Sequence, residues 1–413
     1  MLYSYYDFNT VTADTVLNVD FNCGGELDIG DHKLTVNGSF RQKGRVSVGE
    51  GKFIVRDNYT AIKESLWITG GFVHVGGNMS IRQDAGLHFN GDPDSYLRVD
   101  GNLSTASGNE ADNRFASGTL EIKGNLTQQS SAGNRSIYMD STKLVLSGDR
   151  RQVVTLQDVA GENYLHDVDL SGSLGVKFTC VELKVGSIRG MDRITNELLT
   201  IRDSRLTLQQ DETFHGELAL LDAYVDCNGY RLHTGGALTQ TDSIVNLDRG
   251  ALHVDKDYNI LGNSILQMIR YEDRVYVGGT FATASAFNHS SMLCAGRMEV
   301  LGDFDQSGDP NSFASSELFT MAFLGSGTHQ AHFMEKKAGN KYFANLDPDF
   351  NNVDYITDSI AVTTAVIHIG IGMAEGLAEA FLDPTMAVIA GMFLAAYGKR
   401  TFPGRGMQNC NRN

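Results

Sequence analysis

The chain has 413 residues, and a hydrophobic share of 41% is enough for a continuous core, which argues against an intrinsically disordered chain. Acidic residues outnumber basic ones by 50 to 34, and because the resulting net charge of −16 repels phosphate backbones, we expect no nucleic acid partner. Glycine is frequent at 45 residues and proline scarce at 5, which favours an all-β chain that turns on glycine without interrupting its hydrogen-bonded ladders.

Residues 1–19 are interpreted as an N-terminal cap or lead-in. They lack a basic segment followed by an apolar one, so we expect no signal peptide in this chain. Five cysteines occur in the whole sequence, and none stands close enough to another to suggest a zinc site. We therefore expect no metal and no cofactor.

Residues 20–170 carry a short unit whose starts are separated by 19 to 24 residues. Two apolar residues flank a polar one, and a glycine, a small polar residue and a large apolar residue usually follow. Apolar residues at i and i+2 lie on one face of a strand, whereas a helix would scatter them. With two or three short strands per unit and glycine at the corners, each unit is predicted to be one coil of a β-solenoid. The instances are LTVNGSF at 34–40, FIVRDNY at 53–59, VHVGGNM at 73–79, LRVDGNL at 97–103 and LEIKGNL at 120–126.

Stacked coils should align their apolar pairs in an inward ladder. The intervening polar residues then point outward. The expected inward pairs are Val73 with Val75, Leu97 with Val99 and Leu120 with Ile122, and the expected outward residues are His74, Arg98 and Glu121. An asparagine follows the corner glycine in three coils, at 78, 102 and 125. These side chains either form a hydrogen-bonded ladder or merely tolerate the turn conformation.

A second copy of the pattern follows the first. GTLEIKGNL at 118–126 returns as GRMEVLGDF at 296–304, an offset of 178 residues that becomes 198 nearer the N-terminus. The difference is one unit, so copy one has an extra coil near 53–71, a change that a solenoid tolerates because each coil touches only its neighbours. We assign 20–170 to copy one, 171–214 to connecting coils and 215–350 to copy two. The predicted fold is an all-β solenoid, a parallel β-helix of about 20–24 residues per coil and about fifteen coils.

Residues 351–400 are predicted to form an apolar α-helical hairpin, and 401–413 a basic polar tail. Uncharged runs of about 15 residues flank an N-cap and first-turn proline at Asp383 and Pro384. The hairpin is interpreted in three ways: a cover for the open end of the solenoid, a membrane-active hairpin, or a docking helix for a further domain. Membrane contact would run through residues 359–398, with Gly372 and Gly376 allowing close helix packing and Lys399 and Arg400 as the basic flank.

Few residues in the sequence suggest a catalytic or metal-binding site. His253, Asp255 and Asp257 alternate on one outward strand face, a geometry able to hold a cation but more typical of a solvated face. His329 and His332, three residues apart, belong on opposite faces of a strand and are not a metal pair. The sequence lacks the GxSxG, P-loop, HExxH and strand-associated GxGxxG motifs. We expect no catalytic residues and no enzyme.

LTVNGSF, LRVDGNL and the block LVLSGDRRQVVTLQDVAGENYLHDVDL resemble the glycine-punctuated β-solenoid regions of large exported bacterial proteins, the filamentous-haemagglutinin-like adhesins and polymorphic toxins. The resemblance covers residues 20–350 and implies an extracellular or cell-surface stalk or adhesive scaffold, with a cell-surface protein or glycan as partner. Two alternatives remain open: the delivery stalk of a toxin with a membrane-active hairpin, and a polysaccharide-active β-helix enzyme.

Overall fold

The computed structural model describes residues 10–107, 114–129, 137–157, 163–334, 343–347 and 353–357. The chain divides into two units, 1–246 and 247–413. Both are parallel β-solenoids, and together they make about 15 turns. The only helix in the described ranges is the short 3-10 helix η1 (Met191–Arg193) of the first unit. The all-β solenoid fold expected from the sequence is therefore confirmed.

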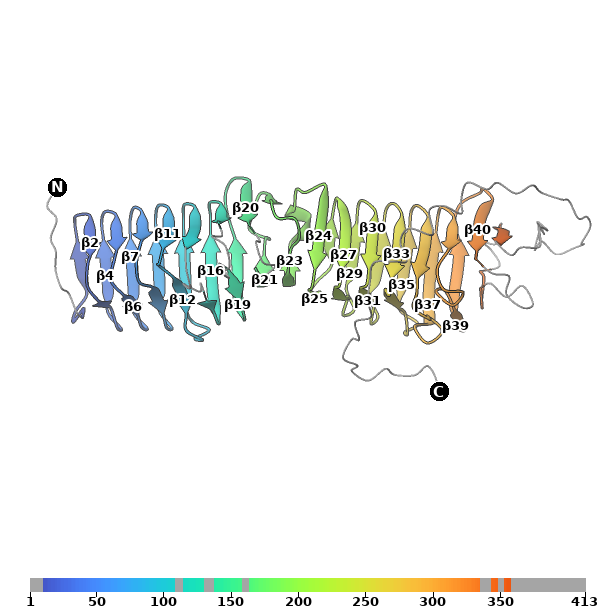
Figure 1. Cartoon of the computed structure of the whole chain (residues 1–413), viewed down its shortest axis with the longest axis horizontal. Coiled ribbons are helices and arrows are strands. Elements are labelled where there is room, and N and C mark those ends of the chain that lie inside the picture. The colour runs from blue at the N-terminus through green and yellow to red at the C-terminus, as the bar shows by residue number, and fades with distance from the viewer. Residues whose placement is uncertain are drawn as a thin grey trace, which may run out of the picture. The chain divides into compact units, whose positions relative to one another are not determined.

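In the first unit, strands of successive coils pair in parallel and build three sheets of nine, eight and six strands (Figure 1). Sheet one contains β1 (Thr15–Leu17), β4 (Lys33–Val36), β7 (Lys52–Val55), β10 (Phe72–Val75), β13 (Tyr96–Val99), β16 (Gly118–Ile122), β19 (Thr142–Leu146), β21 (Leu165–Asp169) and β23 (Val185–Arg189). Sheet two contains β2 (Phe21–Cys23), β5 (Phe40–Gln42), β8 (Tyr59–Ala61), β11 (Met79–Gln83), β14 (Leu103–Ser107), β17 (Leu126–Gln128), β20 (Gln152–Leu156) and β22 (Val176–Phe178). Sheet three contains β3 (Leu27–Asp28), β6 (Val46–Val48), β9 (Leu66–Ile68), β12 (Leu87–Phe89), β15 (Arg114–Phe115) and β18 (Tyr138–Met139).

The strands after η1 belong to a second set of sheets, so the three sheets described above end within the first unit. Its first-unit strands are β24 (Leu198–Arg202), β25 (Arg205–Thr207), β26 (Glu212–Phe214), β27 (Glu217–Leu221), β28 (Tyr224–Asp226), β29 (Arg231–Thr234), β30 (Leu238–Thr241) and β31 (Ile244–Asn246).

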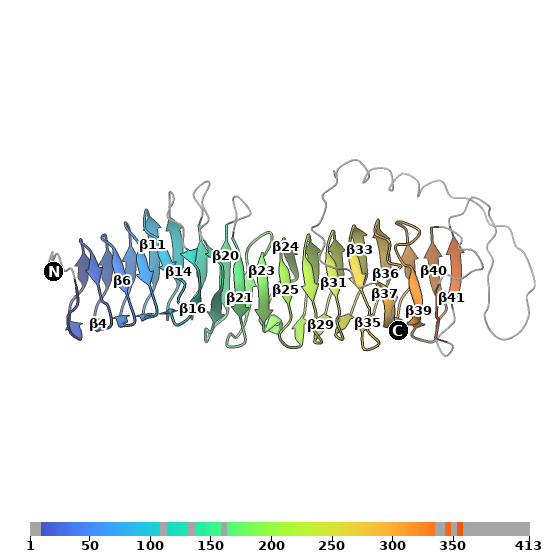
Figure 2. The same ribbon diagram turned by 90° about the horizontal axis from the view of Figure 1, so that it is seen from below.

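The second unit repeats the parallel pairing. Its strands are β32 (Ala251–Val254), β33 (Tyr258–Gly262), β34 (Ile265–Gln267), β35 (Arg274–Val277), β36 (Phe281–Ser285), β37 (Leu293–Val300), β38 (Phe304–Gln306), β39 (Ser315–Phe323), β40 (His329–Phe333) and β41 (Val353–Thr357). In both units the strands of neighbouring coils run side by side when seen from below (Figure 2).

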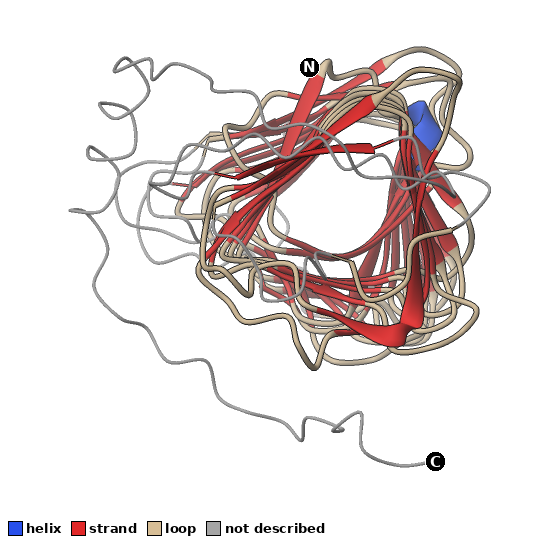
Figure 3. Ribbon diagram, turned by 90° about the vertical axis from the view of Figure 1, so that its right-hand side faces the viewer, coloured by secondary structure: helices blue, strands red, loops and turns tan. Residues whose placement is uncertain are grey.

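The core is a ladder of apolar side chains inside the coils. Val73 pairs with Leu97 and Leu97 with Leu120, while Val75 pairs with Val99 and Val99 with Ile122. All six side chains are fully buried, and the intervening His74, Arg98 and Glu121 are partly exposed, as the alternation predicts. The end-on view shows strands on three sides of the solenoid, with the corners between them (Figure 3). Burial of these aliphatic columns supplies most of the stability.

One corner of the first unit is a ladder of polar side chains and glycines. The Oδ1 atom of Asn78 accepts the backbone N–H of Asn102 at 2.8 Å, and that of Asn102 accepts the N–H of Asn125 at 2.8 Å. Of the two interpretations that the sequence left open for these asparagines, the structure shows the hydrogen-bonded ladder. The neighbouring glycines are required by close approach, since a Cβ on Gly101 would lie 2.6 Å from the carbonyl oxygen of Gly77.

The helical hairpin predicted for residues 351–400 does not share this outcome. Strand β41 (Val353–Thr357) pairs with β40, so the solenoid continues into the range where we placed the start of the hairpin. A helical hairpin over 351–400 is not supported: residues 358–400, like the tail at 401–413, lie outside the described residues.

Candidate functional site

The outward face of sheet three in the first unit carries three aromatic rings, those of Trp67, His88 and Tyr138, and Tyr164 of the next coil continues the line through an isolated bridge to Tyr138. We call these four residues the ring column. Parallel register places them in line, with Arg114 between His88 and Tyr138. Trp67 and His88 stack with their ring centres 4.2 Å apart and an interplanar angle of 14°. The Arg45 guanidinium lies 5.2 Å from the centre of the Trp67 ring. Because Arg45 and His88 come from the coils before and after, the ring of Trp67 is held between them, and Trp67 is partly exposed.

The outward face of sheet one carries a cluster of charged and aromatic groups. Asp100 accepts hydrogen bonds from His74 Nε2 at 2.7 Å and from Arg98 Nε at 2.8 Å. One coil further on, the Tyr96 hydroxyl donates to Glu121 at 2.6 Å and the Ser147 hydroxyl donates to the same carboxylate at 2.5 Å. Side chains from neighbouring coils therefore build one connected surface.

The pKa values of this cluster follow from these contacts. Burial alone would raise the pKa of Asp100, but the hydrogen bonds from His74 and Arg98 outweigh it and lower that pKa. The pKa of Glu121 is lowered in the same way, against burial, by the hydroxyls of Ser147 and Tyr96. Burial and the bond to Glu121 raise the pKa of Tyr96 to about 12. Both carboxylates stay ionised and saturated with donors, which suits fixed recognition better than proton transfer.

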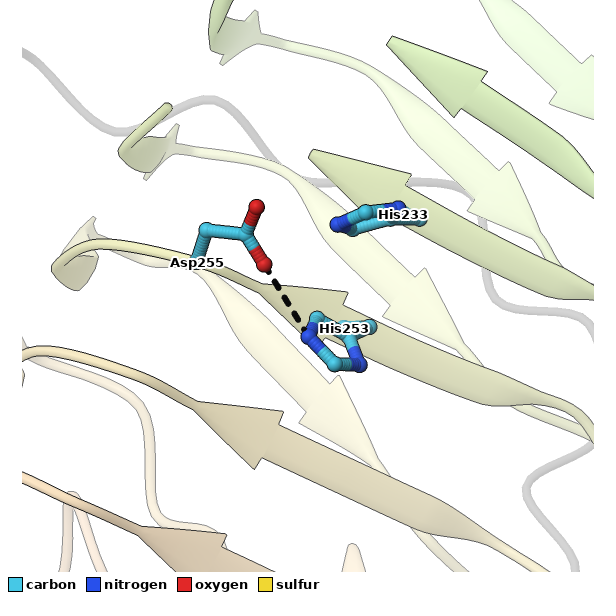
Figure 4. A group of neighbouring side chains, drawn as sticks. All are labelled: His233, His253 and Asp255. Carbon is cyan, nitrogen blue, oxygen red and sulfur yellow. Dashed lines mark ion pairs between the residues drawn. The ribbon is translucent and has the colours of Figure 1, made fainter. Parts of the chain in front are cut away.

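In the second unit the three residues weighed as a cation site do not converge. His253 Nε2 lies 3.0 Å from Asp255, and its ring centre lies 4.3 Å from that of Tyr276. Asp257 instead accepts the backbone N–H of Thr280 at the coil corner. Figure 4 shows the pair of His253 and Asp255 together with His233, a residue of the first unit. The solvated-face interpretation fits this arrangement better than a cation held by all three residues.

The second histidine pair is confirmed to lie on opposite faces of β40. His329 is buried and its Nδ1 lies 2.9 Å from the carbonyl oxygen of Gly302. His332 points outward, with Nδ1 2.5 Å from Asp305. The two rings therefore cannot share a metal ion.

Three buried titratable residues were missed at the sequence level. Glu212 accepts the backbone N–H groups of Gly190 and Met191, and its pKa is raised by burial. Asp273 accepts the N–H groups of Ile269 and Arg270. His289 is almost fully buried and burial lowers its pKa to about 4. Glu212 and Phe214 both occupy inward positions of β26. A charged residue at a position of the alternation that is usually apolar is the sequence feature that could have revealed Glu212.

The predicted helix-packing residues Gly372 and Gly376 and the basic flank at Lys399 and Arg400 lie outside the described residues, so the packing and membrane-contact interpretation stays a prediction. Among the described residues, no helix has the length and apolar character needed to span a membrane. Nor do three carboxylates meet within metal-binding distance in that part of the chain.

Comparison with known proteins gave no match to a family model, to a curated protein or to a solved structure.

Proposed function

We propose that the chain is a non-enzymatic β-solenoid stalk or display scaffold of a bacterial surface or exported protein, and that its outward columns bind a cell-surface protein or glycan. The observation that carries this proposal is the separation of inward and outward columns. Inward positions stay apolar from coil to coil. Outward positions in the same register change chemistry, as in the column formed by Lys52, Phe72, Tyr96, Thr119 and Lys143. A solenoid whose inward residues stay apolar while its outward residues vary can present different side chains to a binding partner.

The ring column supports an adhesive role. It places aromatic rings and an indole N–H along the coils, with the Arg45 guanidinium against the Trp67 ring, at the coil spacing of about 4.8 Å. Aromatic and arginine side chains dominate the binding energy of protein interfaces, because they combine a large apolar area with a polar group. A rigid row of this kind offers repeated contacts without an ordering cost upon binding.

The state of the carboxylates supports a role without catalysis. A glycoside hydrolase needs two carboxyl groups, one of them protonated as the acid. Asp100 and Glu121 are instead held ionised by their donors. A binding surface needs this stable charge pattern, whereas an acid catalyst needs a raised pKa.

The test is binding of the purified chain to intact cells and to an array of glycans. We expect Trp67→Ala to weaken binding about tenfold, since loss of a central aromatic contact costs 1 to 2 kcal/mol or more. Lys63→Ala, an exposed substitution at the coil corner between β8 and β9 and outside the outward columns, is the matched control and should change binding less than twofold. Both variants must keep the wild-type melting temperature.

Two results would overturn the proposal. The first is a chain found only in the cytosol of intact producing cells, as judged by protection from added protease. The second is release of reducing sugar from a polysaccharide by the purified chain, which would favour the enzyme alternative.

A further inference from the structure

Four asparagines occupy the same corner in four successive coils of the first unit, and we call them the asparagine column: Asn58, Asn78, Asn102 and Asn125. Each is followed by one large apolar or aromatic residue and then by a hydroxyl residue. The four triplets are Asn58-Tyr59-Thr60, Asn78-Met79-Ser80, Asn102-Leu103-Ser104 and Asn125-Leu126-Thr127. Asn-x-Ser/Thr is the acceptor motif for sugar transfer to the asparagine side chain. The motif also occurs singly elsewhere in the chain, but only here is it repeated coil after coil.

Each side chain of the column is held by a hydrogen bond to its Oδ1 atom, while its Nδ2 atom is left without one in the part of the chain that the structure describes. Each Oδ1 accepts a backbone N–H of the next coil at 2.8 Å: Asn58 from Asn78, Asn78 from Asn102, Asn102 from Asn125, and Asn125 from Val153. Asn58, Asn78 and Asn102 are exposed and Asn125 is partly exposed. From this arrangement we infer that the asparagine column is a row of N-glycosylation sites.

The fold itself does not require this motif. In the second unit the same corner is built with aspartate: Asp257 accepts the N–H of Thr280, and Asp303 accepts that of Gln330, both at 2.8 Å. The position two residues later is then Asn259 or Asp305, without a hydroxyl. Since a carboxylate serves the ladder equally well, asparagine and hydroxyl occur together in the first unit for a reason other than coil geometry.

The chemistry balances with a nucleotide- or lipid-activated sugar as the second substrate. The Nδ2 atom forms a bond to C1 of the sugar, while the bond from C1 to the diphosphate oxygen breaks. The diphosphate leaves with the bonding electron pair, and one Nδ2 proton passes to a base. The product is a secondary amide whose Oδ1 still accepts the N–H of the next coil, so a modified asparagine keeps its place in the ladder.

The motif is not presentable once the coil has formed. The middle residues Tyr59, Met79, Leu103 and Leu126 point inward and are almost fully buried. Ser80 is 8% exposed, and its hydroxyl accepts a hydrogen bond from Arg82 Nε. Sugar transfer therefore precedes folding of these coils. Because neighbouring coils stand about 4.8 Å apart, small saccharides fit on all four sites and large branched ones do not.

The test is peptide mass spectrometry of the full chain isolated from the cells that make it. We expect the four peptides to carry the mass of one or a few sugar residues. In Thr60→Val and Ser104→Ala the modification should disappear from Asn58 and Asn102 and persist at the other two sites. Asn78→Asp, which imitates the corner of the second unit, should lose the sugar at that site and keep the wild-type melting temperature.

Unmodified peptides at all four sites would overturn the inference, and so would a mass change no larger than deamidation. Sugar that persists in the Thr60→Val variant at Asn58 would show that the hydroxyl motif is not what is recognised. A second measurement follows the order of events: with an asparagine-specific transferase and a nucleotide-activated hexose, the urea-unfolded chain should accept at least tenfold more sugar than the folded chain. A chain without sugar could still be a display scaffold, so this inference and the proposed function fail separately.

Discussion

Replacing Gly101 by alanine tests whether the coil corners are held by close backbone contact. A Cβ at this position would lie 2.6 Å from the carbonyl oxygen of Gly77 and 2.7 Å from Oδ1 of Asn78. Either the two corners separate or the Asn78 side chain leaves the ladder. Overpacking of this kind costs about 1–3 kcal/mol, and the hydrogen bond from Asn102 to Asn78 contributes about 1 kcal/mol. We therefore expect Gly101→Ala to destabilise the surrounding coils by about 2–4 kcal/mol.

The assay must be local, because a solenoid unfolds coil by coil. Amide hydrogen exchange in β13, β14 and β16 should speed up by about 30-fold to 1,000-fold, which corresponds to that range of free energies. Gly172→Ala is the matched control, since its Cβ would meet nothing closer than 3.4 Å. If exchange in these strands were the same in both variants, close packing of the corner would not be what fixes the glycine.

Two further predictions concern the core of each unit. Leu120 is fully buried, so Leu120→Ala should lower the free energy of unfolding by about 2–5 kcal/mol, while the adjacent outward Thr119→Ala should stay within about 0.5 kcal/mol in urea denaturation. Equal effects would contradict the inward ladder. Burial depresses the pKa of His289 from 6.5 to about 4 in the folded chain. Above pH 6.5 the His289 ring is neutral in both the folded and the unfolded state, so its protonation takes nothing from the free energy of unfolding. As the pH falls towards 4 only the unfolded state binds the proton, so about 3 kcal/mol is lost. His289→Gln should remove most of this slope in melts of the second unit between pH 7 and pH 4, and an unchanged slope would refute the assignment.

The coil architecture could be predicted from the sequence because one physical rule repeats in every unit. Apolar residues at i and i+2, such as Val73 and Val75, fix the inward face of a strand. A recurring glycine followed by asparagine, as at Gly101 and Asn102, fixes the corner. Because every coil shows the same pattern independently, an exception at one position does not change the predicted architecture.

The surface was less predictable, because it depends on which outward residues share a register. The stacking of Trp67 on His88 joins residues 21 positions apart, and their alignment requires the strand pairing between β9 and β12. Spacing between coils varies from 19 to 24 residues, so sequence alone leaves the partner of each outward side chain open. Residues such as His289 were also unpredictable, since the loop after β36 rather than a strand brings that ring into the core.

The variable spacing itself leads to a final prediction. The register pairs Phe53 with Val73, so deletion of residues 53–72 joins Lys52 to Val73 and places Val73 at the position that Phe53 held. One whole coil is removed and every remaining side chain keeps its face. The corner ladder loses Asn58, whose Oδ1 accepts the N–H of Asn78, at a cost of about 1 kcal/mol.

We expect this variant to fold with an unchanged circular dichroism signal per residue. Its first unit should also unfold within a few degrees of the wild type, because stability in a solenoid is close to a sum over neighbouring coils. Deletion of 53–62 is the matched control: half a coil is lost, strands of one sheet are driven into another, and the polar residue Lys63 takes an inward position. That chain should lose the protected amides of β4 to β14. If both deletions folded equally well, the units would not be held by coil register, and the separation of inward and outward columns would lose its physical basis.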